Sequence, residues 1–337
     1  MYDEERKYET AKPLSEAERA SIWEMSSGLQ AADNLKTSDY CDSVGEKYIT
    51  GEYTSDEAVK DLENHYQGEK SRQKEAEIVT ARIVKLVESR KGTAFRLEPQ
   101  TLLVIHKRLF AGQLEQESWE GKWRTENISK PEPVLGGRSA KYADAGEILY
   151  YLENDLGEER KYRYKRSFDR ADIKHLSTFV TKIWETHPFR EGNTRTTAVF
   201  AQLYLNSLGF KVDNSLFAEN GKWFRDALVR ASYTEMSEGI ENDDSFLCMF
   251  FENLLCGANH DLPNIDLNRH GIRVNEDIPY RTPDEYKKEK AVKQVRVPNE
   301  RPRTEPLRVA SDVKRVSAAP KKTTLKEDLQ RFHNHLT

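Results

Sequence analysis

Cysteines and long apolar runs are scarce in this sequence, and their scarcity excludes several classes of protein. Cys41, Cys248 and Cys256 are odd in number and far apart, which favours free thiols over a disulfide framework or a zinc site. No run of about 18 apolar residues occurs, so we expect no transmembrane helix and no membrane partner. The acidic N-terminus has no apolar core and is not that of a signal peptide. We therefore expect a cytoplasmic protein.

The composition favours a helical core with polar extensions. Hydrophobic residues make up only 37% of the 337 residues, whereas charged residues make up 33%. The formal net charge of −4 is nearly balanced, so bulk electrostatics do not favour binding to nucleic acid. Residues 275–337 differ from the rest, with six prolines and 15 Lys and Arg against 10 Asp and Glu. This composition predicts a basic, mostly disordered tail.

The N-terminal part predicts a polar arm at 1–14 and a small unit of three helices at 15–66. A helix is expected from about Ser38 to Gly51, and Thr54 with Glu57 forms a capping-box pattern that begins the next one. About fifty residues bury little core alone. We therefore expect this unit to dock on the adjoining domain.

The remaining patterns predict an all-α core. Helices are expected at roughly 70–90, 102–110, 144–157, 169–186, 193–208, 220–233 and 243–257. The exception is 131–142, where two short extended runs flank Gly136 and Gly137. That arrangement predicts a β-hairpin.

The residues best suited to binding and catalysis lie at 187–196, HPFREGNTRT, between two apolar helical patterns. Gly192 permits a tight turn, and the free N–H groups of the next helix then offer an anion site. Arg195 can clamp a phosphate, and Asn193 can donate its amide to a phosphate oxygen. The stretch therefore predicts a phosphate-binding turn.

His187 and Glu191 add the means of catalysis. An imidazole with an ordinary pKa of about 6.5 can take the proton of an attacking hydroxyl. A carboxylate beside a polyphosphate suits Mg²⁺, which needs one or two protein ligands. Each residue alone also fits a structural or surface role. Their joint occurrence favours in-line transfer of a phosphorus group to a hydroxyl.

Residues 187–195 resemble the Fic-family signature, HPFx(D/E)GN(G/K)R, and differ from it only at Thr194. The resemblance covers roughly 75–260 and implies an all-α Fic catalytic domain at 70–260. It implies transfer of AMP from ATP to a Ser, Thr or Tyr hydroxyl of a target protein, or of the protein itself. The implied catalytic residues are His187 and Asn193, and the implied Mg²⁺ ligand is Glu191. The implied nucleotide-binding residues are Gly192, Asn193, Thr194 and Arg195.

The resemblance extends to the hairpin. Trp119, Gly121 and Arg124 fit the family's pattern ahead of its flap, and residues 132–142 fit the flap itself. In the family the flap docks the target's backbone by strand addition. The docking residues that this implies are Val134, Leu135, Gly136, Gly137, Ser139 and Ala140.

One departure concerns the distal phosphate. Many Fic proteins carry a second arginine three residues after the first, and here that position is Ala198. In the family this arginine grips the γ-phosphate. Arg190 and Arg225 are candidate replacements. The departure leaves open another nucleotide or phosphate donor.

Residues 15–66 resemble, more distantly, the antitoxin of some Fic toxins, in which an (S/T)xxxE(G/N) motif directs a glutamate at the second arginine. The aligned segment here is 29–34, which lacks the hydroxyl residue and offers Asp33 and Asn34 as candidate regulatory residues. The unit regulates by another contact, is a relic, or is purely structural. Residues 234–239 match the motif literally, and we interpret them as a helix C-terminus closed by Gly239.

Three functions are consistent with these patterns. The first is AMP transfer to a protein hydroxyl. The second is a transferase of the same fold that uses another donor. The third is a non-catalytic regulatory module, although intact His187, Glu191, Asn193 and Arg195 argue against a decayed site.

Overall fold

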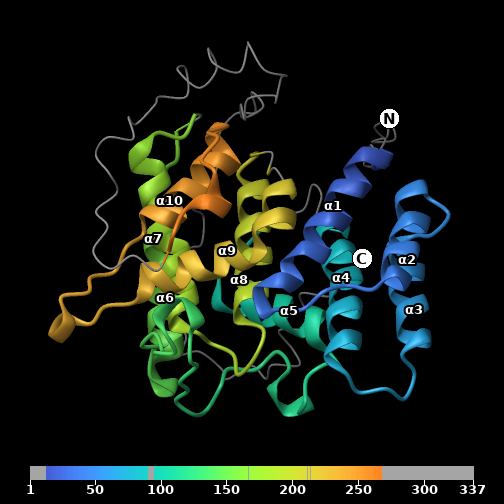
Figure 1. Ribbon diagram of the computed structural model, residues 1–337, viewed down its shortest axis with the longest axis horizontal. Coiled ribbons are helices and arrows are strands. Elements are labelled where there is room, and N and C mark those ends of the chain that lie inside the picture. Colours follow the sequence, from blue (N-terminus) through green and yellow to red (C-terminus); the bar gives the residue numbers. More distant parts are fainter. Residues whose placement is uncertain (1–12, 90–94, 166, 211, 213, 268–337) are drawn as a thin grey trace, which may run out of the picture. The chain divides into compact units, whose positions relative to one another are not determined.

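Figure 1 shows a computed structural model of the chain, which describes residues 13–89, 95–165, 167–210, 212 and 214–267. The described residues are helical apart from loops and two isolated β-bridges, which confirms the all-α prediction. No described helix is both long and apolar enough to span a membrane. All of the described residues belong to one compact unit. The predicted tail at 275–337 and nearly all of the predicted arm at 1–14 lie outside the described residues.

The N-terminal residues form the three predicted helices, with an additional 3₁₀ turn. The elements are α1 (Glu16–Gly28), η1 (Leu29–Asp33), α2 (Asp39–Thr50) and α3 (Ser55–His65). The capping box predicted at Thr54 and Glu57 is present at the start of α3. Gly51 ends α2 in the left-handed conformation, as expected. Local sequence signals therefore account for most of these helix ends.

These helices pack on the rest of their unit through α4 (Arg72–Ser89) and α9 (Asn214–Ser232). Helix α1 contacts both, and α3 contacts α4. The approach of α1 to α9 is close enough to exclude side chains. A Cβ on Gly28 would lie 2.2 Å from the Ala218 carbonyl oxygen, and one on Gly221 would lie 2.5 Å from the Gly28 carbonyl oxygen. These contacts agree with the expectation that residues 15–66 dock on the adjoining domain.

Helix α8 (Asn193–Ser207), which begins at the predicted site, packs against three other helices. Helices α4, α5 and α7 all contact α8 (Figure 1), and its residues from Asn193 to Leu205 are all buried. The remaining helices of the fold are α5 (Pro99–Phe110), α6 (Ile148–Glu159), α7 (Arg170–Thr186) and α10 (Ser245–Phe251), with a π-helical turn at Glu252–Cys256. Short 3₁₀ turns occur at Glu117–Trp119, Pro133–Leu135, Ala145–Glu147, Met236–Glu238 and Leu262–Asn264.

The structure corrects two details of the predictions. The hairpin at 131–142 reverses at Gly136 and Gly137, but its pairing is a single bridge between Glu132 and Arg138 around a 3₁₀ turn, so the two extended runs are absent. Residues 234–239 lie beyond α9, which ends at Ser232, and Gly239 in the left-handed conformation closes a 3₁₀ turn at Met236–Glu238 rather than an α-helix. They form a second such turn, closed by a bridge between Glu235 and Ile240.

We predict that Gly28→Ala destabilises the protein by about 1–3 kcal/mol, because the new methyl group overlaps the backbone of α9. Urea or thermal unfolding measures the change. Gly157→Ala is the matched control, since the nearest atom to its Cβ is the end of Arg160 at 3.7 Å. That variant is expected to be neutral or slightly stabilising. Equal stability of Gly28→Ala and the natural protein would contradict the close packing of α1 on α9.

Candidate active site

His187 ends α7 in a left-handed backbone conformation, with φ at 46°. Pro188 disfavours the α conformation for the residue before it, and the His187 N–H donates to the Trp184 carbonyl at 3.0 Å. Positive φ is uncommon for residues with a Cβ. Among the described non-glycine residues it occurs elsewhere only at Asn34, the other member of the predicted regulatory pair. Such conformations cluster at functional sites.

The His187 ring is buried with one nitrogen free to accept a proton. Nδ1 lies 3.2 Å from the Trp184 carbonyl oxygen, so Nδ1 carries the proton and Nε2 is the acceptor. Nε2 is buried and has no hydrogen-bond partner within the described part of the chain. Burial, reinforced by the Lys130 charge, holds the pKa of His187 well below its usual value. The imidazole is therefore neutral at pH 7 and has the form that a general base requires.

Tyr142 fixes the plane of this ring. It stacks on His187 with 3.9 Å between ring centroids and 22° between planes, while its hydroxyl lies 3.3 Å from a carboxylate oxygen of Glu132. Burial, followed by the charge of Glu132, raises the pKa of Tyr142 above its usual value. The phenol is therefore protonated and donates to that carboxylate.

Arg124 ties the His187 turn to the segment that leads into the flap. Its Nε donates to the His187 carbonyl at 2.8 Å, and its backbone N–H donates to the Pro188 carbonyl at 2.9 Å. The guanidinium also donates to the carbonyls of Glu126 and Ala143, on the two sides of the flap. The family pattern pointed to Arg124, and the structure gives it this positioning role.

Asn193 and Gly192 shape the turn between His187 and α8. The Asn193 amide accepts from the Phe189 N–H at 2.9 Å and donates to the Phe189 carbonyl at 2.7 Å. Asn193 is the first residue of α8, and its side chain also closes the loop from Phe189 to Asn193. Gly192 has φ at 74°, and a Cβ there would lie 2.5 Å from the Phe110 ring, so the turn requires glycine.

Glu191 has a fixed backbone and a partly free carboxylate. Its carbonyl accepts from His106 Nε2 at 3.0 Å, while His106 Nδ1 accepts from the Gly121 N–H at 2.9 Å. Burial lowers the pKa of His106 to about 3, so His106 is a neutral structural link. The Glu191 carboxylate is 40% exposed and lies 3.6 Å from the Lys130 ammonium.

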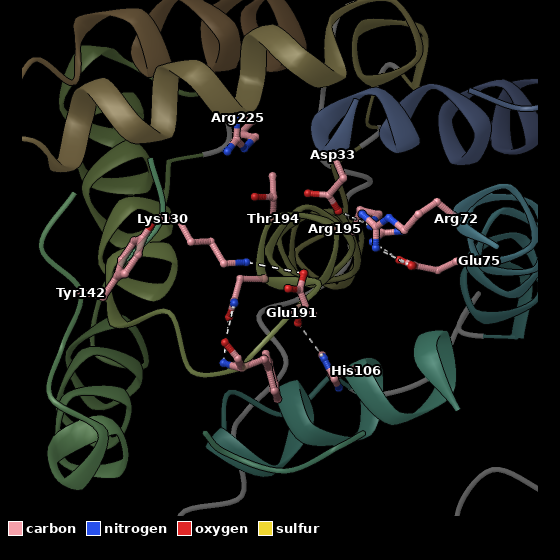
Figure 2. A network of polar contacts seen from close by, with 12 residues as sticks. Asp33, Arg72, Glu75, His106, Lys130, Tyr142, Glu191, Thr194, Arg195 and Arg225 are labelled. Atoms are coloured by element: carbon pink, nitrogen blue, oxygen red, sulfur yellow. Dashed lines mark hydrogen bonds and ion pairs between the residues drawn. The ribbon is translucent and has the colours of Figure 1, made fainter. Parts of the chain in front are cut away.

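Arg195 lies at the centre of a buried polar network (Figure 2). Its side chain is fully buried, with Nε 2.6 Å from the Asp33 carboxylate and Nη2 2.5 Å from the Glu75 carboxylate. Nη1 donates to Gln30 Oε1 at 3.0 Å. The predicted phosphate clamp is therefore held by residues of α1–η1 and of α4. The structure brings the predicted regulatory residue Asp33 directly to it.

The charge state of Asp33 reflects this contact. Burial alone would raise the pKa of Asp33, but the surrounding cations outweigh burial and hold it below its usual value. Those cations are Arg195, Lys130, Arg225 and Arg72. The neighbouring Asn34 is exposed and closes η1 with a left-handed backbone. Asp33 therefore makes the side-chain contact with Arg195, while Asn34 contributes the backbone turn.

Thr194 is also buried, and its hydroxyl accepts from Trp184 Nε1 at 3.0 Å. This bond joins the first turn of α8 to the last turn of α7. The residue that departs from the family signature therefore connects the helices on either side of the site.

The flap is anchored at its ends and exposed at its turn. Leu135 and Ala140 are buried, Val134 and Ser139 are half-buried, and Gly136 and Gly137 are exposed. Two ion pairs hold it: Glu132, which is buried, with Arg225 at 2.5 Å, and Arg138 with Glu238 at 3.0 Å. The second pair links the flap to the turn at 234–239.

Several residues at the site gave no usable signal in the sequence. Gln30, Glu75, Lys130 and Tyr142 carry no local motif, although each lies within the turn or network around His187 and Arg195. Of the two replacements considered for the missing arginine, Arg190 lies over the Trp119 ring at 5.6 Å. Arg225 instead pairs with Glu132 of the flap, and its charge helps to lower the pKa of His187 and of Asp33.

The described residues contain no cluster of three or more His, Cys, Asp or Glu side chains that could hold a metal ion alone. Magnesium beside a polyphosphate does not need such a cluster, because phosphate oxygens and water complete its shell. The partly exposed Glu191 carboxylate, next to the start of α8, fits that limited requirement. Glu191 is thus the residue that could hold Mg²⁺ with a nucleotide.

The chain is similar to several solved structures. Similar structures include the BepC protein, a VirB-translocated effector with bound AMPPNP from Bartonella tribocorum. It is 17% identical with a TM-score of 0.42, covering 56% of this chain and 89% of that one. The N-terminal FIC domain of Bep8 from Bartonella sp. 1-1C is 18% identical with a TM-score of 0.41, covering 55% and 86%.

Sequence comparison adds a relative and a family. Over 130 residues the chain is 28% identical to the "Probable protein adenylyltransferase y4lH" of Sinorhizobium fredii (strain NBRC 101917 / NGR234). The match covers 38% of this chain and spans 61% of the relative's length. The sequence model of the Fic/DOC family matches residues 96–205, which include α5, α7, the His187 turn and most of α8. Residues 96–205 therefore belong to the Fic/DOC family.

Proposed function

We propose that this protein transfers AMP from ATP to a hydroxyl group of a target protein. The observation that carries the proposal is the neutral His187 ring, with an unpartnered and buried Nε2 at the turn before α8. A base of this kind beside the free N–H groups of a helix start suits attack on a phosphate. The name of the Sinorhizobium relative, a probable protein adenylyltransferase, supports the same reaction.

In the proposed reaction the target's hydroxyl oxygen attacks the α-phosphorus of ATP. His187 Nε2 takes the hydroxyl proton as the new oxygen–phosphorus bond forms. The bond from the α-phosphorus to the oxygen that bridges to the β-phosphate breaks, and pyrophosphate leaves. The N–H groups at the start of α8, with Asn193, Thr194 and Arg195, stabilise the phosphate charge. Glu191 would hold Mg²⁺, which when bound would supply positive charge to the leaving phosphates.

The flap is proposed to receive the target. Its turn at Gly136 and Gly137 is exposed, and a Cβ built on either glycine meets no atom within 4 Å. An extended peptide can therefore reach the backbone there and pair with it. Tyr142, a few residues further on, stacks on His187, so a peptide held at the flap is near the base.

We further propose that residues 15–66 restrain the enzyme through Asp33. Arg195 is fully buried and paired with Asp33, Glu75 and Gln30. It can bind a phosphate only when at least one of these partners is exchanged for the nucleotide. Asp33 is the less buried of the two carboxylates, at 23% exposure against 4% for Glu75, so it is the partner to be displaced.

A different phosphate donor is the second candidate function. The observation that favours it is Ala198, which is buried in α8 and places no cation at that position. Intact-mass measurement after incubation with a panel of nucleotides separates the two, because the mass of the added group identifies the donor fragment.

We predict that His187→Ala abolishes the modification of substrate or of the protein itself, since no base remains to take the hydroxyl proton. Intact-mass spectrometry after incubation with ATP and Mg²⁺ reports the added AMP. The surface variant His65→Ala is the control and is expected to retain activity. Modification by His187→Ala at the natural rate would exclude the proposed mechanism.

The activity is predicted to be insensitive to pH between about 8 and 6.5. The pKa of His187 is lowered from about 6.5 by burial, so the neutral, active form persists as the pH falls through that value. Activity then declines only at lower pH, when the folded protein takes up the proton. A profile of kcat/KM whose acidic limb has its midpoint at or above 6.5 would show that the base is a group other than the buried His187.

Asp33→Asn is predicted to raise the rate of modification about tenfold or more. The change removes one of the two carboxylate charges that pair with Arg195 and keeps the shape of the Asp33 side chain. Labelled-ATP incorporation measures the rate. Asp39→Asn, on an exposed position of α2, is the control and is expected to leave it unchanged. An unchanged or lower rate in Asp33→Asn, with the protein folded, would mean that Asp33 stabilises the site without restraining it.

A further inference from the structure

Two cations near the site have no role in the proposed reaction. Lys130 lies just before the flap, and Arg225 lies on α9. Figure 2 shows both on the same side of Thr194, with Asp33 and Arg195 on the other side. Both act on Asp33 and on His187, because each helps to lower the pKa of the two groups. Lys130 lies beside Glu191, just before the start of α8. Arg225 pairs with Glu132, and Tyr142, which also contacts Glu132, stacks on the candidate base His187.

Lys130 is free to change partner. Its ammonium lies 3.6 Å from the Glu191 carboxylate, and the two side chains are 32% and 40% exposed. An exposed pair at this distance contributes little to stability. The backbone N–H of Lys130 donates to Ser139 Oγ at 3.0 Å, which fixes the base of the side chain while its four-carbon stem stays flexible. A phosphate could therefore draw the ammonium away from Glu191 at small cost.

Arg225 is held more rigidly. One of its nitrogens lies 2.5 Å from Glu132, which is only 1% exposed, and another lies 3.7 Å from Asp226. The Arg225 side chain is still 15% exposed. Because the ion pair with Glu132 orients the guanidinium without enclosing it, Arg225 can present its remaining donors to an anion.

Asp33, the anion paired with Arg195, is also stabilised by these two cations. The Asp33 carboxylate is acted on by Lys130, Arg225, Arg195 and Arg72 together. One carboxylate carries one negative charge, whereas the end of a nucleoside triphosphate carries more and has several acceptor oxygens. Displacement of Asp33 by such a group leaves Lys130 and Arg225 facing phosphate oxygens.

We propose that Lys130 and Arg225 bind the terminal phosphate of the nucleotide and thereby select a triphosphate over a diphosphate. The inference rests on the proposed function, because it places the nucleotide at the start of α8. Lys130 contributes a flexible positive charge, and Arg225 donates the N–H groups of a guanidinium that Glu132 holds in orientation. Neither residue touches the reacting hydroxyl, so both act on nucleotide affinity and selectivity.

The test is nucleotide binding to the full-length chain, measured by titration calorimetry with ATP, ADP and AMP in the presence of Mg²⁺. Lys130→Met removes the charge and keeps the length of the side chain. It is expected to weaken ATP binding about tenfold, the loss expected for one charged hydrogen bond, and to change ADP binding by less than about twofold. For Arg225 the paired variant Glu132→Gln with Arg225→Gln avoids an unpaired buried carboxylate, and the same ATP-selective loss is expected.

Lys141→Met is the matched control, an exposed lysine of the same segment, and is expected to bind all three nucleotides as the natural protein does. Each variant is checked by its unfolding midpoint without nucleotide. The titrations are repeated in the Asp33→Asn background, where the proposed competitor of the nucleotide is weakened. Equal losses for ATP and ADP, or no loss, overturn the selectivity inference alone. Failure of the natural chain and of Asp33→Asn to bind any nucleotide overturns the proposed function with it.

Discussion

The Arg195 guanidinium is fully buried, and the rest of the site depends on how its charge is satisfied. A buried charge is tolerated only when partners surround it. Here those partners are Glu75 on α4 and the pair Gln30 and Asp33 on α1–η1. Two of the three acceptors therefore come from the N-terminal helices. Residues 15–66 and the first turn of α8 are far apart in the sequence, yet the charge of Arg195 in α8 is balanced in part by residues 15–66.

Local rules predicted the features that depend on neighbours in the chain. The capping box at Thr54 and Glu57 and the apolar stripe of α7 both follow from spacings of three or four residues, and both are present. The turn at His187 follows from Pro188, which acts on the residue before it. Asp33 was found as a candidate by aligning a motif. Its contact with Arg195, rather than with a residue one turn later, needed the packing of η1 against α8.

The remaining features depend on residues far apart in the sequence. His106 meets Glu191 across 85 positions, and Glu75 meets Arg195 across 120, so no local pattern could have paired them. The flap was predicted as a hairpin, yet Pro131 and Pro133 flank its one bridge and have no N–H to extend it. Helix α9 ends at Ser232, close to its predicted end, and the Asp243 N–H and the Asn242 amide donate to the carbonyls of Arg230 and Ala231 in its last turn.

The contact between Gly28 and Gly221 couples the positions of α1 and α9, which lie on either side of the site. No side chain lies between Gly28 and Gly221, so the backbones of α1 and α9 touch directly. A shift of one helix cannot be absorbed there by a change of side-chain rotamer. Asp33 lies five residues beyond Gly28, and Arg225 lies one helical turn beyond Gly221. A shift of α1 that withdraws Asp33 from Arg195 therefore also pushes or pulls on the helix that carries Arg225. The positions of Asp33 and Arg225, on the two sides of the proposed phosphate site, therefore both depend on this one backbone contact.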